Sequence, residues 1–132
     1  MYIKYKIWSE DWLDEDTAEE YTLYHFGPYD IDDNHLSFSD KKKLVKILEE
    51  LNDVLQQSCG GEFEKHANFC IISDDKSLFI KHIDLLRTIG FQDAEPDSVM
   101  MPFRTLKELT IKINSLRKNI PARIKSFKDF YN

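Results

Sequence analysis

The stretch Tyr2-Ile-Lys-Tyr-Lys-Ile-Trp8 alternates between two kinds of side chain with a period of two. In a strand with this sequence, Ile3, Tyr5 and Ile7 lie on one side and the lysines lie on the other. Such alternation is typical of a strand with one face on a core. It predicts a sheet that begins at the start of the chain, and it leaves no apolar run that would suit a signal peptide.

A second strand is predicted over Tyr21–Phe26, where aromatic and β-branched residues recur. We expect it to run antiparallel to the first strand and to end at Gly27-Pro28, a pair that breaks regular structure. The polar stretches Ser9–Glu19 and Tyr29–His35 are predicted to be mostly loop. The aromatic residues expected in the core are Tyr5, Phe26 and either Tyr21 or Tyr24.

The first predicted helix begins at Ser39, whose hydroxyl suits the capping position, and ends before Gly60-Gly61. Its apolar residues repeat every three or four positions and form one wide stripe. The members of this stripe are Leu44, Val45, Ile47, Leu48, Leu51, Val54 and Leu55.

The second half of the chain predicts further elements around the same core. His66–Ile72 is compact and β-prone, so we expect a central strand there. Lys76–Gly90 fits either a helix or a strand followed by a helix, and its later apolar spacing favours a helix. Residues 91–101 are expected as a short strand or extended loop. Pro102 suits the first turn of a helix that runs to about Lys118, and an amphipathic segment follows over Ala122–Tyr131.

The length of 132 residues and the 42% hydrophobic content are those of one domain, so residues 1–132 are predicted to form a single domain. The expected fold class is α+β, with a small, mostly antiparallel sheet packed against three to four helices. Cys59 and Cys70 show no disulfide framework, which is typical of a reducing compartment and predicts a cytoplasmic protein. No apolar run approaches the ~18 residues that a membrane span needs.

Charge is distributed very unevenly. Between Ile7 and Asp40 there are eleven carboxylates, seven aromatic residues and no Lys or Arg. The net charge of −6 divides into −9 for residues 1–66 and +3 for residues 67–132. Such a protein is repelled by nucleic acids and anionic membranes and attracts basic proteins. A protein partner with a basic surface is therefore expected, without direct nucleic-acid or membrane binding.

The candidate partner-binding residues lie in the two predicted loops of this acidic stretch. Trp12 is singled out because an indole in a polar loop has no periodic reason to be buried, and tryptophan is enriched at interface hot spots. The candidates are Glu10, Asp11, Trp12, Asp14, Glu15 and Asp16 in the first loop, and Tyr29, Asp30, Asp32 and Asp33 in the second.

Two alternatives for this stretch stay open. Aromatic residues at alternating positions also suit a sheet core, and loop carboxylates also serve solubility alone. The acidic loops are also candidates for internal neutralisation by a basic C-terminal region. Its members are Arg104, Lys107, Lys112, Arg117, Lys118, Arg123, Lys125 and Lys128.

Motifs of catalysis and cofactor binding are absent from the sequence, which has no nucleophile elbow, phosphate-binding glycine loop, dinucleotide fingerprint or His-Glu-x-x-His. The spacing Asp30-x-Asp32-Asp33-x-His35 is interpreted as turn chemistry, not as a metal site. The set Cys59, His66 and Cys70 is one ligand short of a closed zinc site. No cofactor or metal is predicted, and His25 and His82 are expected to be half exposed.

A small, acidic, cysteine-poor α+β chain with the stretch Ser9-Glu-Asp-Trp-Leu-Asp-Glu-Asp16 resembles the immunity proteins of bacterial toxin–immunity systems, including contact-dependent growth inhibition. The resemblance implies a tight complex with one cognate toxin, often a nuclease whose basic cleft the carboxylates cover. Two other classes remain: an assembly or regulatory module, or a homodimer, acting through the C-terminal helices, and a small enzyme with a pocket that gathers His25, Asp30 or Asp32.

Overall fold

The computed structural model describes residues 1–59, 64–65 and 70–118 and confirms the predicted α+β class. Its sheet has six strands in the order β3-β4-β2-β1-β6-β5, and all neighbouring pairs are antiparallel. The elements are β1 (Tyr2–Leu13), β2 (Glu20–Asp32), α1 (Phe38–Cys59), β3 (Glu64–Lys65), β4 (Ile71–Ser73), α2 (Lys76–Thr88), β5 (Gln92–Asp93), β6 (Ser98–Pro102) and α3 (Leu106–Arg117).

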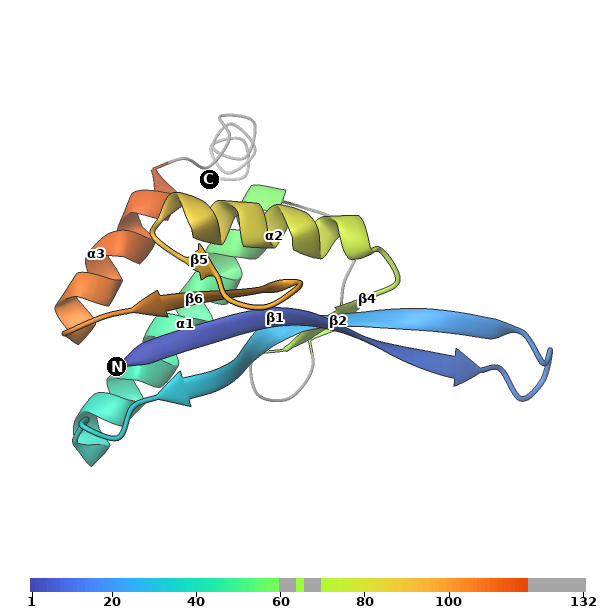
Figure 1. The fold of residues 1–132 in the computed structure, drawn as a ribbon, viewed down its shortest axis with the longest axis horizontal. Coiled ribbons are helices and arrows are strands. Elements are labelled where there is room, and N and C mark those ends of the chain that lie inside the picture. The colour runs from blue at the N-terminus through green and yellow to red at the C-terminus, as the bar shows by residue number, and fades with distance from the viewer. Residues whose placement is uncertain (60–63, 66–69, 119–132) are drawn as a thin grey trace, which may run out of the picture.

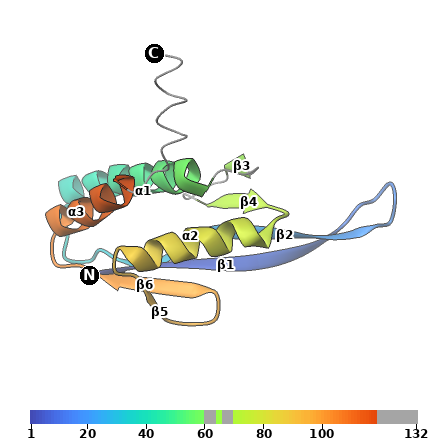
Figure 2. The same ribbon diagram turned by 90° about the horizontal axis from the view of Figure 1, so that it is seen from above.

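The three helices lie on one side of the sheet, so the molecule has two layers (Figures 1 and 2). Ile3, Tyr5 and Ile7 are buried on the helix side of β1, as their alternation predicts. The Tyr5 ring meets Phe26 at 5.4 Å and Phe91 at 5.8 Å between centroids. The predicted core tyrosine of β2 is Tyr24, which packs partly buried against this cluster.

The β1–β2 hairpin is much longer than the strands beside it. β6 pairs with β1 only over Tyr2–Lys6, and β4 pairs with β2 only over Tyr24–Phe26. Beyond those positions, among the described residues, the two strands pair only with each other, out to Leu13 and Glu20. Residues 9–23, called the arm from here on, therefore project from the body of the domain (Figure 1).

The prediction of loop over Ser9–Glu19 is wrong for Ser9–Leu13, which continues β1. These polar residues form strand because each faces a cross-strand neighbour from β2, and a two-stranded ribbon needs no apolar face on a core to keep its backbone hydrogen bonds. Only residues 14–19 form the connection.

The predicted end of β2 at Gly27-Pro28 is also wrong, because the strand runs on to Asp32. Pro28 lies opposite Tyr5, beyond the residues that β4 pairs and beside a register shift between Lys4 and Tyr5. Proline, which lacks an N–H, is tolerated at such an irregular position without a β4 neighbour. The segment Tyr29–Asp32 is consequently strand and not loop.

The helices match their predictions, although the starts of α1 and α3 are shifted. In α1 the capping hydroxyl belongs to Ser37 and not to Ser39, because Ser37 Oγ accepts the Asp40 N–H at 3.1 Å. The helix favoured over residues 76–90 is confirmed as α2, with Asp75 as its cap.

Two further sequence predictions need correction. Pro102 ends β6 instead of opening a helix, and α3 starts after Thr105, whose hydroxyl accepts the Glu108 N–H at 3.1 Å. The strand predicted over His66–Ile72 is described only over Ile71–Ser73, as β4, which lies inside the sheet between β3 and β2. Residues 66–69 and the predicted segment Ala122–Tyr131 lie outside the described residues.

Both histidines expected at half exposure are buried, with His82 at 0% and His25 at 6% relative exposure. His82 lies on the core face of α2, where its ring meets Phe26 and Phe79 at 5.3 and 5.8 Å. His82 shares the buried face of α2 with Phe79 and Leu86, so the prediction of half exposure is wrong because the helix places this polar side chain toward the core.

Candidate partner-binding arm

A tight acidic turn closes the arm. The Asp14 N–H donates to the Glu19 carbonyl at 2.9 Å, and the Ala18 N–H donates back to the Asp14 carbonyl at 2.8 Å. Asp14 Oδ1 accepts the N–H groups of Asp16 and Thr17 at 2.9 and 3.3 Å. One carboxylate thus shapes the turn, while the side chains of Glu15 and Asp16 are exposed at its end.

The arm has two faces, because successive side chains of a strand point to opposite sides. The face turned away from the helices, called the outer face, carries the cross-strand pairs Glu10–Leu23 and Trp12–Tyr21, and it continues at the base of the arm with Trp8–His25. The opposite face carries Ser9–Tyr24, Asp11–Thr22 and Leu13–Glu20. The carboxylates predicted from one loop are therefore divided between two surfaces.

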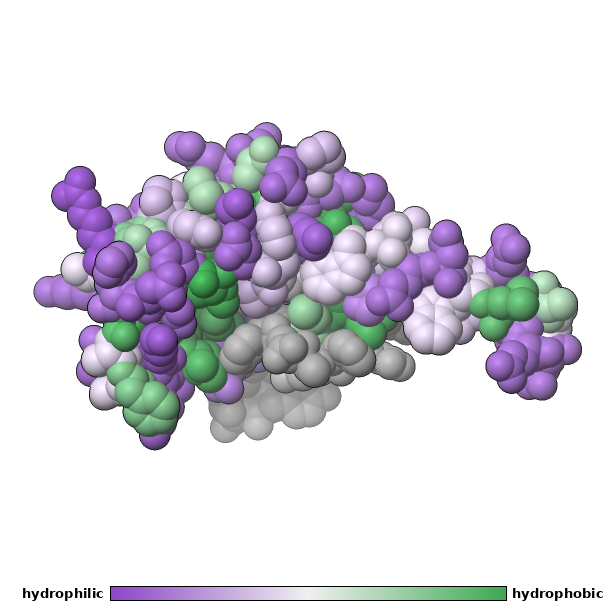
Figure 3. Space-filling model, turned by 60° about the horizontal axis from the view of Figure 1, so that its bottom comes forward, coloured by the Kyte–Doolittle hydropathy of each residue, from purple (hydrophilic) through white to green (hydrophobic). Residues whose placement is uncertain are grey.

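Large apolar side chains are exposed toward the end of the arm. Trp12 is 48% exposed on the outer face beside Tyr21 at 45%, and Leu13 is 59% exposed on the opposite face. Figure 3 shows the far end of the arm as a hydrophobic spot surrounded by hydrophilic side chains. An exposed indole and phenol ring among carboxylates are typical components of a protein interface.

Tyr21 and Leu23 are members of the outer face that sequence reasoning missed. The signal was present, since Trp8, Glu10 and Trp12 continue the alternation of Tyr2, Lys4 and Lys6 along β1. Their β2 partners follow only from the register of the hairpin, which the sequence does not supply.

Aromatic, basic and acidic side chains contact one another at the base of the arm. The Trp8 and His25 rings stack with centroids 5.2 Å apart, and His25 Nε2 lies 3.4 Å from Glu10 Oε1. Lys6 Nζ lies 4.7 Å from the centre of the Tyr29 ring and 5.7 Å from that of Trp8. These contacts hold the outer-face side chains of β1 in place where the arm leaves the body.

The second candidate group, Tyr29, Asp30, Asp32 and Asp33, lies at the other end of the hairpin. Tyr29 Oη is 2.9 Å from Ser98 Oγ, and Asp30 Oδ2 lies 3.8 Å from Lys4 Nζ. Asp30 also accepts the Tyr2 hydroxyl at 3.1 Å, a hydrogen bond that raises the pKa of Tyr2. Lys4 and Leu13 are about 30 Å apart along the strand, so the structure does not bring the two groups together.

The basic C-terminal region does not neutralise the arm within the part of the chain that the structure describes. Arg117 pairs with Glu50 of α1 at 3.4 Å. No described ion pair joins a Lys or Arg of residues 104–118 to a carboxylate of the arm. Arg123, Lys125 and Lys128 lie outside the described residues.

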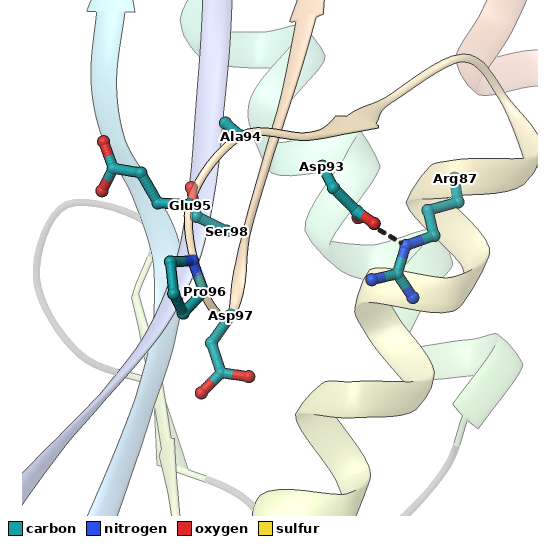
Figure 4. A pocket seen from close by; sticks show the side chains of 7 residues that line it. All are labelled: Arg87, Asp93, Ala94, Glu95, Pro96, Asp97 and Ser98. Atoms are coloured by element: carbon teal, nitrogen blue, oxygen red, sulfur yellow. Dashed lines mark hydrogen bonds and ion pairs between the residues drawn. The ribbon is translucent and has the colours of Figure 1, made fainter.

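A second acidic turn, not singled out in the sequence, connects β5 to β6 beside a shallow pocket of about 400 Å³ (Figure 4). Two of its carboxylates already have basic partners. Asp93 Oδ1 accepts a hydrogen bond from Arg87 Nε at 2.8 Å, and Asp97 Oδ2 lies 3.0 Å from Lys76 Nζ. The turn is thereby tied to α2, and most of its charge is compensated within the fold.

We find no metal site in the described part of the chain. Among residues 1–59, 64–65 and 70–118, no three or more His, Cys, Asp or Glu side chains are placed to hold a metal ion together. Burial raises the pKa of the Cys59 thiol to about 11, which keeps it protonated. His66, the remaining member of the cysteine set, lies outside the described residues.

The residues of the proposed enzyme pocket also lie apart. His25 is opposite Trp8 on the outer face, whereas Asp30 and Asp32 are opposite Lys4 and Tyr2. All three lie on the same face of the hairpin, but Lys4 and Tyr2 are four and six residues from Trp8, about 13 and 20 Å along β1, so the structure does not gather them around a common cavity.

Comparison with protein-family models, curated proteins and solved structures finds no match. None of the helices in the described part of the chain is long and apolar enough to cross a membrane. What can be argued about function therefore rests on the fold and on the arm.

Proposed function

We propose that this protein is an immunity protein, which binds one cognate toxin domain and neutralises it by covering a basic active-site surface. The observation that carries the proposal is the arm. It projects from the domain with seven carboxylates, no Lys or Arg, and an exposed Trp12–Tyr21 pair. A nuclease is the toxin that fits best, because its substrate-binding cleft is positively charged.

Inhibition would proceed by electrostatically steered occlusion. The carboxylates of the arm accelerate encounter with a positive surface, an effect that salt weakens. The aromatic side chains then lose their contact with water and slow dissociation. Because the arm is a narrow ribbon, it suits a concave partner, and its exposed rings would reach into a cleft that a flat surface could not fill.

The test first asks whether the neighbouring reading frame encodes a toxin-like C-terminal domain, whose absence would count against the proposal, and then produces that domain together with this protein. We expect growth to be rescued by the wild type, and binding to weaken by about 2 kcal/mol or more when Trp12→Ala removes the anchor. Neutralising Glu10, Asp11 and Asp14 to their amides should mainly lower the association rate and its dependence on salt.

A matched control neutralises three exposed carboxylates away from the arm, Glu49, Asp53 and Asp74. This variant has the same net charge as the arm variant. If both variants bind the toxin domain as tightly and as fast as the wild type, the arm is not the binding surface and the proposal fails.

A further inference from the structure

Building on the proposed function, we infer that the outer face of the arm receives an arginine side chain from a basic segment of the partner protein. Glu10 would pair with the guanidinium, and the Trp12–Tyr21 pair would stack against it. Glu10 and Trp12 are two positions apart on the same face of β1, about 7 Å along the strand. A guanidinium stacked on the indole is therefore within reach of the carboxylate.

The same face of the sheet already holds two cations in this way. Lys4 Nζ lies 5.5 Å from the Tyr2 ring centre, and Lys6 Nζ lies over the rings of Tyr29 and Trp8. Lysine and aromatic side chains thus follow one another along β1 as far as Trp8. The next outer-face position holds a carboxylate, Glu10.

The aromatic pair at the far end has no such cation. Among the described residues, no Lys or Arg lies over the ring of Trp12 or Tyr21. Both rings remain nearly half exposed, and the Glu10 side chain keeps 46% exposure although it approaches His25. The far end of the arm therefore offers two aromatic rings and the Glu10 carboxylate but no cation, whereas closer to the body Lys4 and Lys6 lie over the aromatic rings.

Arginine fits this place better than lysine. Its guanidinium is flat and weakly hydrated, so it stacks on an aromatic ring while its edge donates two hydrogen bonds to a carboxylate. The outer face presents the aromatic rings and the Glu10 carboxylate side by side. Leu23 lies opposite Glu10, where the aliphatic part of the arginine side chain would pack against it.

The arm of a second copy of this chain does not suit the same face. The arm carries seven carboxylates and no basic residue, so two arms placed against each other would repel. Charge complementarity instead selects a basic segment of a different protein.

The experiment titrates the full-length protein with a fluorescent peptide of alternating arginine and serine. Two neighbouring carboxylates provide a matched pair of variants, since Glu10 lies on the outer face and Asp11 on the opposite one. Glu10→Gln should weaken binding about fivefold or more, whereas Asp11→Asn, with the same net charge, should weaken it less than about twofold.

An uncharged pair of variants checks the aromatic contribution. Trp12→Ala should weaken peptide binding about fivefold, and Leu13→Ala, which removes an even more exposed side chain from the opposite face, should leave it unchanged. Thermal unfolding of each variant shows that the fold persists, as expected for side chains exposed on the arm.

Equal weakening by Glu10→Gln and Asp11→Asn would mean diffuse attraction by the whole arm, and it would overturn the inference. Absence of peptide binding by the wild type would do the same. This outcome is distinct from that of the toxin test. If the toxin binds the wild type and both variants lose the same affinity for it, the proposed function stands and only the arginine site is refuted.

Discussion

Acidification is predicted to destabilise the fold through one buried side chain, His82. The ring is fully buried between Phe26 and Phe79, and this burial lowers the pKa of His82 from 6.5 to about 4. An interaction with the backbone of Leu55 acts in the opposite direction but is outweighed. Neither ring nitrogen makes a hydrogen bond of regular geometry to a described residue, so the native fold keeps the imidazole neutral.

The direction of the effect follows from which state binds the proton first. In the unfolded chain His82 takes up a proton near its ordinary pKa of 6.5, whereas the folded protein resists until about pH 4. The free energy of unfolding therefore falls as the pH falls through this window. The difference between the two pKa values corresponds to about 3 kcal/mol in total, of which about 2 kcal/mol is lost between pH 7 and pH 4.5.

The assay is urea unfolding at a series of pH values, followed by circular dichroism, for the wild type and His82→Leu. The variant should be at least as stable as the wild type at pH 7, and its stability should depend less on pH by about 2 kcal/mol over this range. The control is His35→Leu, since that histidine is exposed, and it should keep the wild-type slope. If His82→Leu has the same slope as the wild type, burial of a neutral imidazole is not the cause.

Three further changes test the packing and capping described above by chemical unfolding. Tyr5→Phe should leave stability unchanged or raise it, because Tyr5 Oη is buried without a partner among the described residues, and a loss above about 1 kcal/mol would reveal one. Thr105→Ala should cost about 1 kcal/mol by removing the α3 cap, and retained stability would contradict that role. Leu51→Ala should lower the free energy of unfolding by about 3 kcal/mol, because Leu51 is buried. Val45 is 42% exposed on the same helix, so Val45→Ala should lower it by less than about 1 kcal/mol, and similar losses for the two variants would refute the placement of the core.

The core and the helices were largely predictable, because they depend on spacing within a single segment. Alternation in residues 2–8 identified Ile3, Tyr5 and Ile7, and spacing of three and four identified the buried residues of α1, although it wrongly included the exposed Val45. Cap positions were less certain, since Ser37 and Ser39 have the same chemistry and only the backbone path decides between them.

The arm was only partly predictable. Its acidity, its lack of basic residues and the unusual position of Trp12 were visible in the sequence. Its continuation as a ribbon was not, because strand in this region depends on pairing between β1 and β2 and not on an apolar face. For the same reason Tyr29 and Asp30 were grouped with Trp12, although the hairpin holds them at its opposite end.

Periodicity and composition alone therefore account for the α+β class, the core face of β1 and the negative charge of residues 7–40, since each is a property of consecutive residues. Contacts between distant segments account for the rest. The register of β1 against β2 assigns Glu10 and Asp11 to opposite surfaces, and the short reach of β4 and β6 leaves the arm free. Packing of α2 against the sheet buries His82, because burial depends on what the whole fold places around a side chain.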